Sequence, residues 1–259
     1  MLTGIYLHLS IVMFTAKDIE SKLVGMKDET QRINLMRFFK TDIGSYGEGD
    51  EFIGLKVPQT RSVVKEFKHK IPLNEIEKLL FSRWHEVRLS GFLLLVEEMT
   101  INIPKKNDRD IEVKAWNREN IAQFYIRHAS QANNWDLVDL SCPKILGVYL
   151  RYAPDKMDIL YRLAKSNNLW EQRIAMVSNW MLIRYGIFQP TIDIADILLE
   201  HSHDLIHKSV GWMLRELGKK DERALLEYLD KKSAKMSRTT LRYAIEKLPY
   251  NQRQYWLKR

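Results

Sequence analysis

The segment NNWDLVD, residues 133–139, holds two side chains whose types and spacing could do chemistry. Trp135 and Asp139 are four residues apart, so on a helix they lie one above the other on the same face. An indole beside a carboxylate is an unusual pair to bury without a purpose. The alternative is a core tryptophan with an aspartate that faces solvent or pairs with another helix, and the segment alone leaves both interpretations open.

Two later segments repeat the theme of aromatic surface next to charge. Trp170 lies close to Arg173, and Trp212 lies between Lys208 and Arg215 at helical spacing. If these faces and the first pair point into one groove, the groove offers aromatic platforms, phosphate-binding cations and one carboxylate. That set suits the backbone or sugar of a nucleic acid.

The elements that must position these residues are helices. The chain has only 7 prolines and 11 glycines, apolar residues recur at helical spacing over long stretches, and no alternating run supports a sheet. Tryptophan-containing or related apolar blocks recur about every 35 residues after Trp135, a length suited to one antiparallel helix pair per unit. The sequence therefore predicts an all-α fold, a curved superhelical solenoid with a long concave binding surface.

Two breaks interrupt this pattern, at residues 45–58 and 101–110. The first contains Gly47, Gly49 and Gly54, but no Gly-Lys-Ser/Thr follows and its acidic residues would repel phosphate, so these are interpreted as turn glycines. Tyr46 is the one member that could contact a ligand. Because helical repeats resume after each break, we expect one continuous domain over residues 15–259.

A pair of histidines, His203 and His207, has the spacing of zinc ligands on a helix. Asp204 stands where a zincin places glutamate, however, and no third ligand is evident. Capping or packing roles are favoured, and we expect no metal and no cofactor.

Composition sets broader limits. The net charge of +8 and pI near 9.4 make a polyanionic partner worth considering. The single cysteine, Cys142, excludes an internal disulfide and a thiolate zinc site, and it favours a reducing, cytoplasmic home. Residues 1–14 are apolar but too few to span a bilayer, so we interpret them as an N-terminal extension, a start-site artefact or a loosely packed segment, and expect no membrane association.

The sequence strongly resembles the AlkD family of DNA alkylation-repair proteins, which are built from HEAT-like helical repeats. The likeness covers almost the whole chain after residue 15. It rests on six ordered blocks: FFKTDIGSYGEGDEFIGLKVPQTR, SRWHEVRLSGFLLLVEEM, NNWDLVDLSCPKILG, LWEQRIAMVSNWMLIRYG, HDLIHKSVGWMLRELGKKD and SRTTLRYAIEKLP.

This resemblance implies a DNA glycosylase that removes purines made cationic by alkylation, such as 3-methyladenine and 7-methylguanine. Trp135 and Asp139 match the family's catalytic tryptophan and aspartate, Arg173 the arginine that approaches DNA at the lesion, and Trp212 the second tryptophan of the cleft. Tyr46 matches a tyrosine near the lesion less securely, because the loop varies in length among family branches.

The resemblance also implies binding to double-stranded DNA by a monomer. Further candidates for phosphate contact are Lys144, Lys208, Arg215, Arg238 and Arg242, although each could equally be a solvated surface residue. No lysine stands out as a Schiff-base nucleophile, so base removal without strand cleavage is expected. The alternatives are a non-catalytic DNA-binding module and a protein-interaction scaffold.

Overall fold

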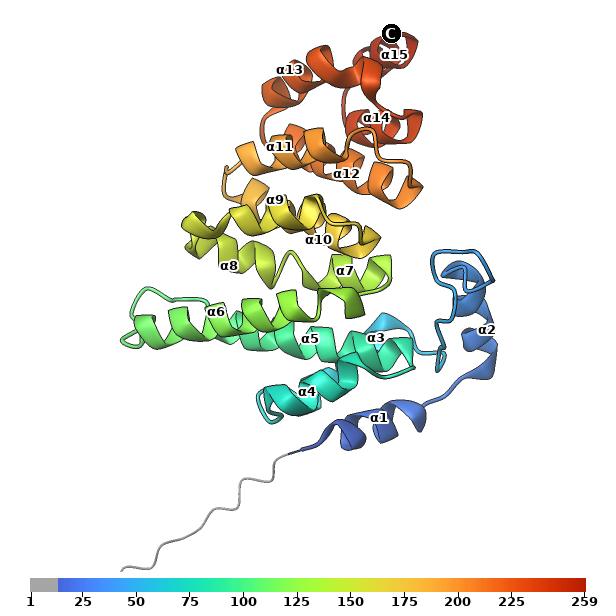
Figure 1. The fold of residues 1–259 in the computed structure, drawn as a ribbon, viewed down its shortest axis with the longest axis vertical. Coiled ribbons are helices and arrows are strands. Elements are labelled where there is room, and N and C mark those ends of the chain that lie inside the picture. Colours follow the sequence, from blue (N-terminus) through green and yellow to red (C-terminus); the bar gives the residue numbers. More distant parts are fainter. Residues whose placement is uncertain (1–13) are drawn as a thin grey trace, which may run out of the picture.

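A computed structural model describes residues 14–259 as an elongated stack of helices that runs from α1 at one end to α15 at the other (Figure 1). Within this range the backbone forms one isolated bridge, Glu51 with Trp84, and no strand, so the all-α prediction is confirmed. The helices are α1 (Ala16–Val24), α2 (Glu29–Phe38), α3 (Val57–Phe67), α4 (Leu73–Leu80), α5 (His85–Ile101), α6 (Ile111–Arg127), α7 (Trp135–Ser141), α8 (Leu146–Tyr152), α9 (Asp158–Ala164), α10 (Leu169–Arg184), α11 (Gln189–Leu198), α12 (Asp204–Lys220), α13 (Glu222–Lys232), α14 (Arg238–Ile245) and α15 (Tyr250–Lys258), with short 3₁₀ turns at Ala129–Gln131, Pro154–Lys156 and Ser233–Lys235.

The first helix begins at a clear sequence signal. Thr15 caps α1, and its backbone N–H and hydroxyl both donate to the Asp18 carboxylate at 2.8 Å. Phe14, the last residue of the predicted extension, packs edge-to-face against Phe67, with ring centroids 5.0 Å apart. Residues 1–13 of that extension lie outside the described residues. No helix within residues 14–259 is long and apolar enough to cross a membrane.

The predicted period of about 35 residues is visible in the second half of the chain. Helices α7, α10, α12 and α14 begin at Trp135, Leu169, Asp204 and Arg238, and each packs directly against the next. Short connections join α9 to α10, α11 to α12 and α12 to α13, so paired helices run in opposite directions. The buried apolar side chains form one continuous cluster along the stack. This arrangement agrees with the predicted solenoid and aligns the N-terminal turns of its successive helices.

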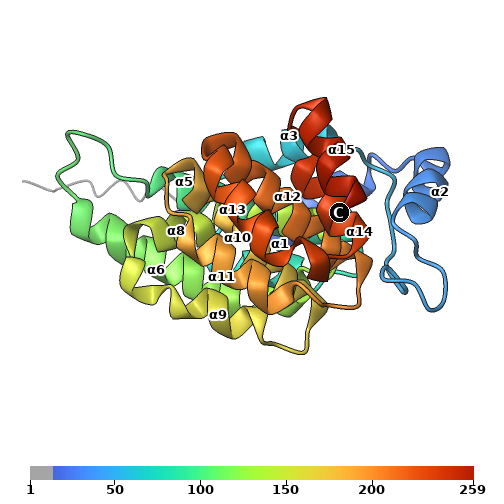
Figure 2. The ribbon, with the colours of Figure 1, turned by 90° about the horizontal axis from the view of Figure 1, so that it is seen from above.

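The helix α2 lies at one edge of this stack, and the segment that follows it returns to the stack, where Ile53 and Leu55 join the buried core (Figure 1). Helix α2 and this segment lie beside the ends of α7, α10 and α12, and the view from above places α2 at the opposite edge from the far end of α6 (Figures 1 and 2). Gly49 lies in a turn of this segment with a φ of +81°, so the turn interpretation of the loop glycines is confirmed at this position. Gly54 lies outside a turn. Its φ is +103° and a Cβ would lie 2.0 Å from the Asp28 carbonyl oxygen, so glycine here allows a close approach of two backbone segments.

Glycines also allow the stacked helices to approach closely. A Cβ on Gly147 of α8 would lie 2.5 Å from the Ser178 carbonyl oxygen of α10, and a Cβ on Gly211 of α12 would lie 2.5 Å from the Thr240 carbonyl oxygen of α14. Backbone atoms cannot rotate away as side chains do. The spacing of neighbouring repeats therefore depends on the missing side chain.

The substitution Gly147→Ala is expected to lower the free energy of unfolding by about 1–3 kcal/mol, the usual cost of overpacking a buried contact. Urea denaturation of the purified protein measures the change. Gly25→Ala is the matched control, because Gly25 is exposed with φ −62° at the end of α1 and a Cβ there would lie 3.3 Å from the nearest backbone oxygen, so alanine should change the free energy of unfolding by less than about 1 kcal/mol. Equal effects of the two substitutions would contradict the close-approach explanation.

Candidate active site

An open cleft of about 810 Å³ separates α2 and its following loop from the ends of α7, α10, α12 and α14. Four of the predicted site residues, Trp135, Asp139, Arg173 and Trp212, line this cleft. The other lining residues are Phe38, Lys40, Ser45, Tyr46, Ser202, His203, Asp204, Leu205, Lys208, Arg215 and Tyr243. The four residues come from three separate repeats, so the stack brings together what the sequence holds far apart.

The centre of the cleft is an ion pair between Asp139 and Arg173. The Arg173 Nε and Nη2 atoms donate to the two carboxylate oxygens at 2.9 and 2.8 Å, a bidentate geometry, and Nη1 donates to the Leu205 carbonyl at 2.5 Å. The Arg173 side chain is only 6% exposed, while Asp139 is 15% exposed. The guanidinium is therefore enclosed by protein, and the carboxylate faces the cleft.

Burial and ion pairing shift the pKa of the Asp139 carboxyl in opposite directions. Burial raises its pKa by penalising the charged form, the Arg173 guanidinium lowers it, and the pKa remains above its ordinary value. A carboxylate with a raised pKa is a stronger base than a free aspartate. Asp139 is thus suited both to stabilise positive charge and to accept a proton from water.

Aromatic rings surround the Trp135 side of the carboxylate. Phe39 stacks on Trp135 with centroids 5.2 Å apart, and Phe38 meets the same indole edge-to-face at 5.8 Å. Trp212 is partly buried and lines the cleft from α12. These contacts fix the plane of Trp135, since each ring prefers a limited set of approaches. Both tryptophans keep a surface available to a ligand.

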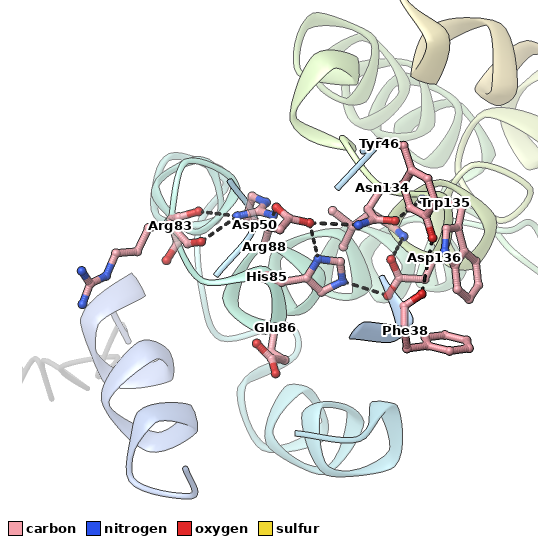
Figure 3. Close-up of polar contacts among 12 residues, drawn as sticks. Phe38, Tyr46, Asp50, Arg83, His85, Glu86, Arg88, Asn134, Trp135 and Asp136 are labelled. Atoms are coloured by element: carbon pink, nitrogen blue, oxygen red, sulfur yellow. Dashed lines mark hydrogen bonds and ion pairs between the residues drawn. The ribbon is translucent and has the colours of Figure 1, made fainter. Parts of the chain in front are cut away.

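A buried polar network holds Trp135 in place from behind (Figure 3). The His85 imidazole lies between two carboxylates, with Nδ1 3.1 Å from Asp50 and Nε2 2.9 Å from Asp136. Asp50 also pairs with Arg88 and accepts from the Asn134 amide at 2.9 Å. Because Asn134 and Asp136 flank Trp135, this network joins α7 to the loop that follows α2.

The pKa values of His85 and Asp50 are shifted by their contacts in this network. Burial alone would lower the pKa of His85, but the Asp136 and Asp50 carboxylates outweigh it and raise the pKa to about 9. Burial would raise the pKa of Asp50, yet hydrogen bonding from His85 and the charge of Arg88 hold it below its ordinary value. His85 is therefore an imidazolium at neutral pH, and it links two anions that would otherwise repel each other.

The glutamate that follows His85 anchors the same loop. Both carboxylate oxygens of Glu86 accept backbone N–H groups, from Ile53 at 2.9 Å, Gly54 at 2.8 Å and Leu55 at 2.9 Å. Three backbone donors in an irregular segment would otherwise need water. The N-terminal turn of α5 thus fixes the loop that carries Tyr46 to the cleft.

The structure places three of the six predicted DNA-contact residues in the cleft: Tyr46, Lys208 and Arg215. The other three, Lys144, Arg238 and Arg242, do not line it. Lys144 lies on the turn after α7, where desolvation of its ammonium group and the nearby charge of Arg61 lower its pKa. Arg238 donates to the Leu257 carbonyl at 3.0 Å, and Arg242 lines a separate hollow beside α15. A DNA contact by these three would have to lie outside the cleft.

One expectation about an individual side chain changes. Trp170 does not offer aromatic surface to the cleft, because it is 8% exposed and packs edge-to-face against Tyr46. Arg173 has three of its nitrogens bonded to protein, a geometry suited to positioning Asp139, and its approach to DNA stays a prediction.

The histidine pair has the structural role that the sequence favoured. His203 caps α12 by accepting from the Leu205 N–H at 3.1 Å, and the His207 ring contacts the His201 carbonyl oxygen. Cys142 is buried, and burial raises the pKa of its thiol well above the ordinary value. The thiol is thus unsuited to act as a nucleophile.

Sequence reasoning missed the cleft residues Phe38, Lys40 and Tyr243 and the whole network around His85. The sequence offered one indication of Lys40, since it lies in the same block as Tyr46. In the structure its Nζ atom lies 5.9 Å from the centre of the Tyr46 ring. The sequence also offered an indication of the buried network, because the charged segment HEVR stands at the start of the very apolar helix α5. Charged residues in such a place must find partners, but the sequence does not say which.

The stacked helix pairs and the cleft at their ends define an α-helical repeat protein. Residues 19–248 match the family model described as DNA alkylation repair enzyme, and the chain therefore belongs to that family, as the resemblance predicted. It is also similar to the structure of a predicted DNA alkylation repair enzyme from Enterococcus faecalis, with a TM-score of 0.69 and 18% identity over 86% of this chain and 97% of that chain. At this identity the likeness shows the fold. No curated protein matches the chain.

The charge on His85 predicts a pH dependence of stability. Its pKa is raised in the folded state from 6.5 to about 9, so its contribution is complete below pH 6.5 and is lost as pH rises toward 9. The full contribution corresponds to about 3 kcal/mol. Urea denaturation across this range should show the native protein losing that stability relative to His85→Gln, which lacks the titration. Parallel pH profiles for the two proteins would contradict the charged-histidine assignment.

Proposed function

We propose that this protein is a monofunctional DNA glycosylase that hydrolyses the N-glycosidic bond of cationic alkylated purines, such as 3-methyladenine and 7-methylguanine, in double-stranded DNA. Membership of the DNA alkylation repair enzyme family supports a role in alkylation repair. The observation that carries the specific activity is the Asp139 carboxylate, held by a buried guanidinium and facing an open cleft between aromatic side chains.

The chemistry of the leaving group explains why few residues are needed to hydrolyse this N-glycosidic bond. Alkylation at N3 or N7 gives the purine a positive charge, so the base departs as a neutral molecule when the C1′–N bond breaks. Little acid catalysis is then needed. Positive charge develops instead on the deoxyribose, in an oxocarbenium-like transition state similar to that of glycosidases.

Asp139 matches this need in charge and position. Its carboxylate is preorganised by two hydrogen bonds from Arg173, so it need not reorganise when charge appears on the sugar. It can also take a proton from the water that attacks C1′, a role that its raised pKa favours. Trp135 and Trp212 would offer electron-rich faces to the cationic centre.

Cations at the rim of the cleft would bind the DNA backbone. Lys208 pairs with Asp204 at 2.8 Å, and Arg215 pairs with Glu246, so each has a carboxylate partner that a phosphate can replace. The Lys208 pair is exposed on both sides, and such pairs are weak, so its exchange for phosphate costs little. Arg215 is itself only 16% exposed, but its partner Glu246 is 44% exposed. A single copy supplies all of these residues, so we propose that the protein acts as a monomer.

The substitution Asp139→Asn is expected to slow the single-turnover release of 7-methylguanine from a duplex by on the order of 100-fold or more, because the transition state loses its preorganised anion. The assay counts free base against time with enzyme in excess. Asp204→Asn is the matched control: it removes the same charge from the same cleft, but from a residue paired at the rim. It should change the rate only a few-fold.

This assay, together with a measurement of duplex binding, separates the alternatives. Equal rates for native protein and Asp139→Asn would remove this carboxylate from the mechanism. Tight duplex binding with no base release by either protein would identify a DNA-binding module. Failure to bind duplex at all would favour a protein-interaction scaffold.

The pairing of Arg173 with Asp139 leads to a second, independent prediction, which concerns the pH dependence of the rate of base release. Release requires ionised Asp139, so the native rate should fall as pH drops through the pKa of that carboxyl. In Arg173→Gln the pKa loses the lowering influence of the guanidinium, and the acidic limb of the profile should move upward by about 1–3 pH units. An unchanged limb with a uniformly lower rate would instead assign Arg173 to DNA binding alone.

A further inference from the structure

The last two helices, α14 and α15, lie at the far end of the stack from α1 and carry much of the positive charge of the chain (Figure 1). Residues 238–259 hold six lysines and arginines and a single acid, Glu246, a net charge of +5 against +8 for the whole chain. Of the six cations, Lys247 and Arg259 have carboxylate partners within residues 14–259, and the other four have none. This end of the protein therefore suits an anionic partner.

A hollow of about 310 Å³ lies between α14 and α15, and two of the four unpaired cations line it. Arg242 comes from α14, Arg253 comes from α15, and the Gln254 amide also lines the space. The Nε atom of Arg253 is buried and has no hydrogen-bond partner within residues 14–259. Because buried donors in proteins are nearly always paired, an unpaired one in a hollow indicates a ligand. Two guanidinium groups and an amide are donors that suit a phosphate.

The hollow adjoins the candidate active site. Glu246 lines the hollow and pairs with Arg215, which lines the cleft. On α14, Arg242 lines the hollow and the next residue, Tyr243, lines the cleft. A ligand that extends from the cleft past Arg215 therefore reaches the two unpaired arginines.

The stacking of the helices sets the distance between the hollow and the Asp139 carboxylate. Three packing steps lead from α7, which carries Asp139, through α10 and α12 to α14. Stacked helices lie about 8–10 Å apart, so the hollow is on the order of 25 Å along the stack from the carboxylate. One strand of a duplex rises about 3.4 Å per nucleotide, and this span therefore equals about seven base pairs. A duplex that follows the stack from Asp139 brings the phosphates of one flank to the hollow.

We propose that the hollow between α14 and α15 is a second phosphate-binding site, which holds the DNA backbone on one side of the damaged nucleotide through Arg242 and Arg253. This inference rests on the part of the proposed function that places duplex DNA in the cleft. The two arginines lie far from the glycosidic bond, so they contribute to the affinity for the duplex and to its register, and not to the rate of bond cleavage.

These arginines differ from the cations at the rim of the cleft. Lys208 and Arg215 must each give up a carboxylate before they bind a phosphate. Arg242 and Arg253 have no carboxylate partner within residues 14–259, so a phosphate binds them without such an exchange. Each phosphate contact of this kind releases counterions from the DNA, and the affinity that it adds falls as salt rises.

The test shortens the DNA and removes the arginines in one series. The substrates are duplexes with one 7-methylguanine and flanks of about twelve base pairs, and matched duplexes in which one flank or the other is cut to about four, too short to reach the hollow. The test variant combines Arg242→Gln with Arg253→Gln. Lys258→Gln is the matched control, because Lys258 is an exposed cation on another face of α15 and lies outside the hollow. Urea denaturation confirms that each variant is folded.

Two quantities are measured, the Kd for each duplex by fluorescence anisotropy and the single-turnover rate of base release at saturating protein. For the native protein, cutting one of the two flanks should raise the Kd by about fivefold or more. The double variant should raise the Kd of the long duplex by a similar factor, lose nothing further when that flank is cut, and reduce the salt dependence of log Kd by about 1–2 in slope. Its rate at saturation should change by less than about twofold. Lys258→Gln should keep the native dependence on the flank.

Several results would overturn the inference. Equal binding of the long duplex by the native protein and the double variant is one, and a loss no larger than that of Lys258→Gln is another. The third is a double variant in which cutting either flank still costs the full native factor, because the arginines would then contact neither flank. Any of these results accompanied by normal base release leaves the proposed function intact. Flank-dependent binding without base release would reject the glycosylase activity and retain the second site, and failure of the native protein to bind duplex would reject both.

Discussion

The ion pair between Asp139 and Arg173 is the constraint around which the cleft is arranged. A carboxylate that is 15% exposed needs a partner to remain charged, and the partner must itself be satisfied. Arg173 meets both conditions, because two of its nitrogens bind the carboxylate and a third binds the Leu205 carbonyl. The pair thereby ties three successive repeats together at the point where their helices open onto the cleft.

The repeat period explains how the pair forms. Asp139 is the fifth residue of α7, Arg173 the fifth of α10, and Lys208 the fifth of α12. Because these helices stack with aligned N-terminal turns, the same position in each repeat returns to the same side of the stack. An acid and a base in equivalent positions of adjacent repeats therefore meet. Lys208 follows in the next repeat, at the rim.

This regularity also marks what the sequence could predict. Apolar periodicity indicated the helices, and the spacing of the tryptophan blocks indicated the stack. Trp135 with Asp139 could be selected because a helix places residues four apart on one face. The fifth-position rule fails at Arg242, which lines a hollow beside α15, whereas its neighbour Tyr243 reaches the cleft. The direction in which a surface cation points depends on local packing, and the repeat period does not predict that packing.

The buried network around His85 was harder to predict from the sequence than the cleft residues. Asp50, His85 and Asp136 come from a loop and two helices, and no local rule pairs them. The loop acids were interpreted only as groups that would repel phosphate, yet Asp50 is buried and anchors the segment that completes the cleft. Its partners became identifiable only when the tertiary structure brought α5 and α7 to that loop.

The two kinds of ion pair at the cleft suggest a division of labour. Lys208 pairs with Asp204 at the surface, where such pairs contribute at most about 1 kcal/mol and water competes for both partners. Arg215 is 16% exposed, and its partner Glu246 is the more accessible member of that pair at 44%. A phosphate can displace those carboxylates readily. Arg173 is enclosed, and withdrawing it would leave Asp139 without a counter-charge in a poorly solvated place, a cost of about 3–5 kcal/mol for a buried pair. In the proposed function, the cations that can exchange partners would hold DNA, whereas the one that cannot would hold the carboxylate in place while charge develops on the sugar.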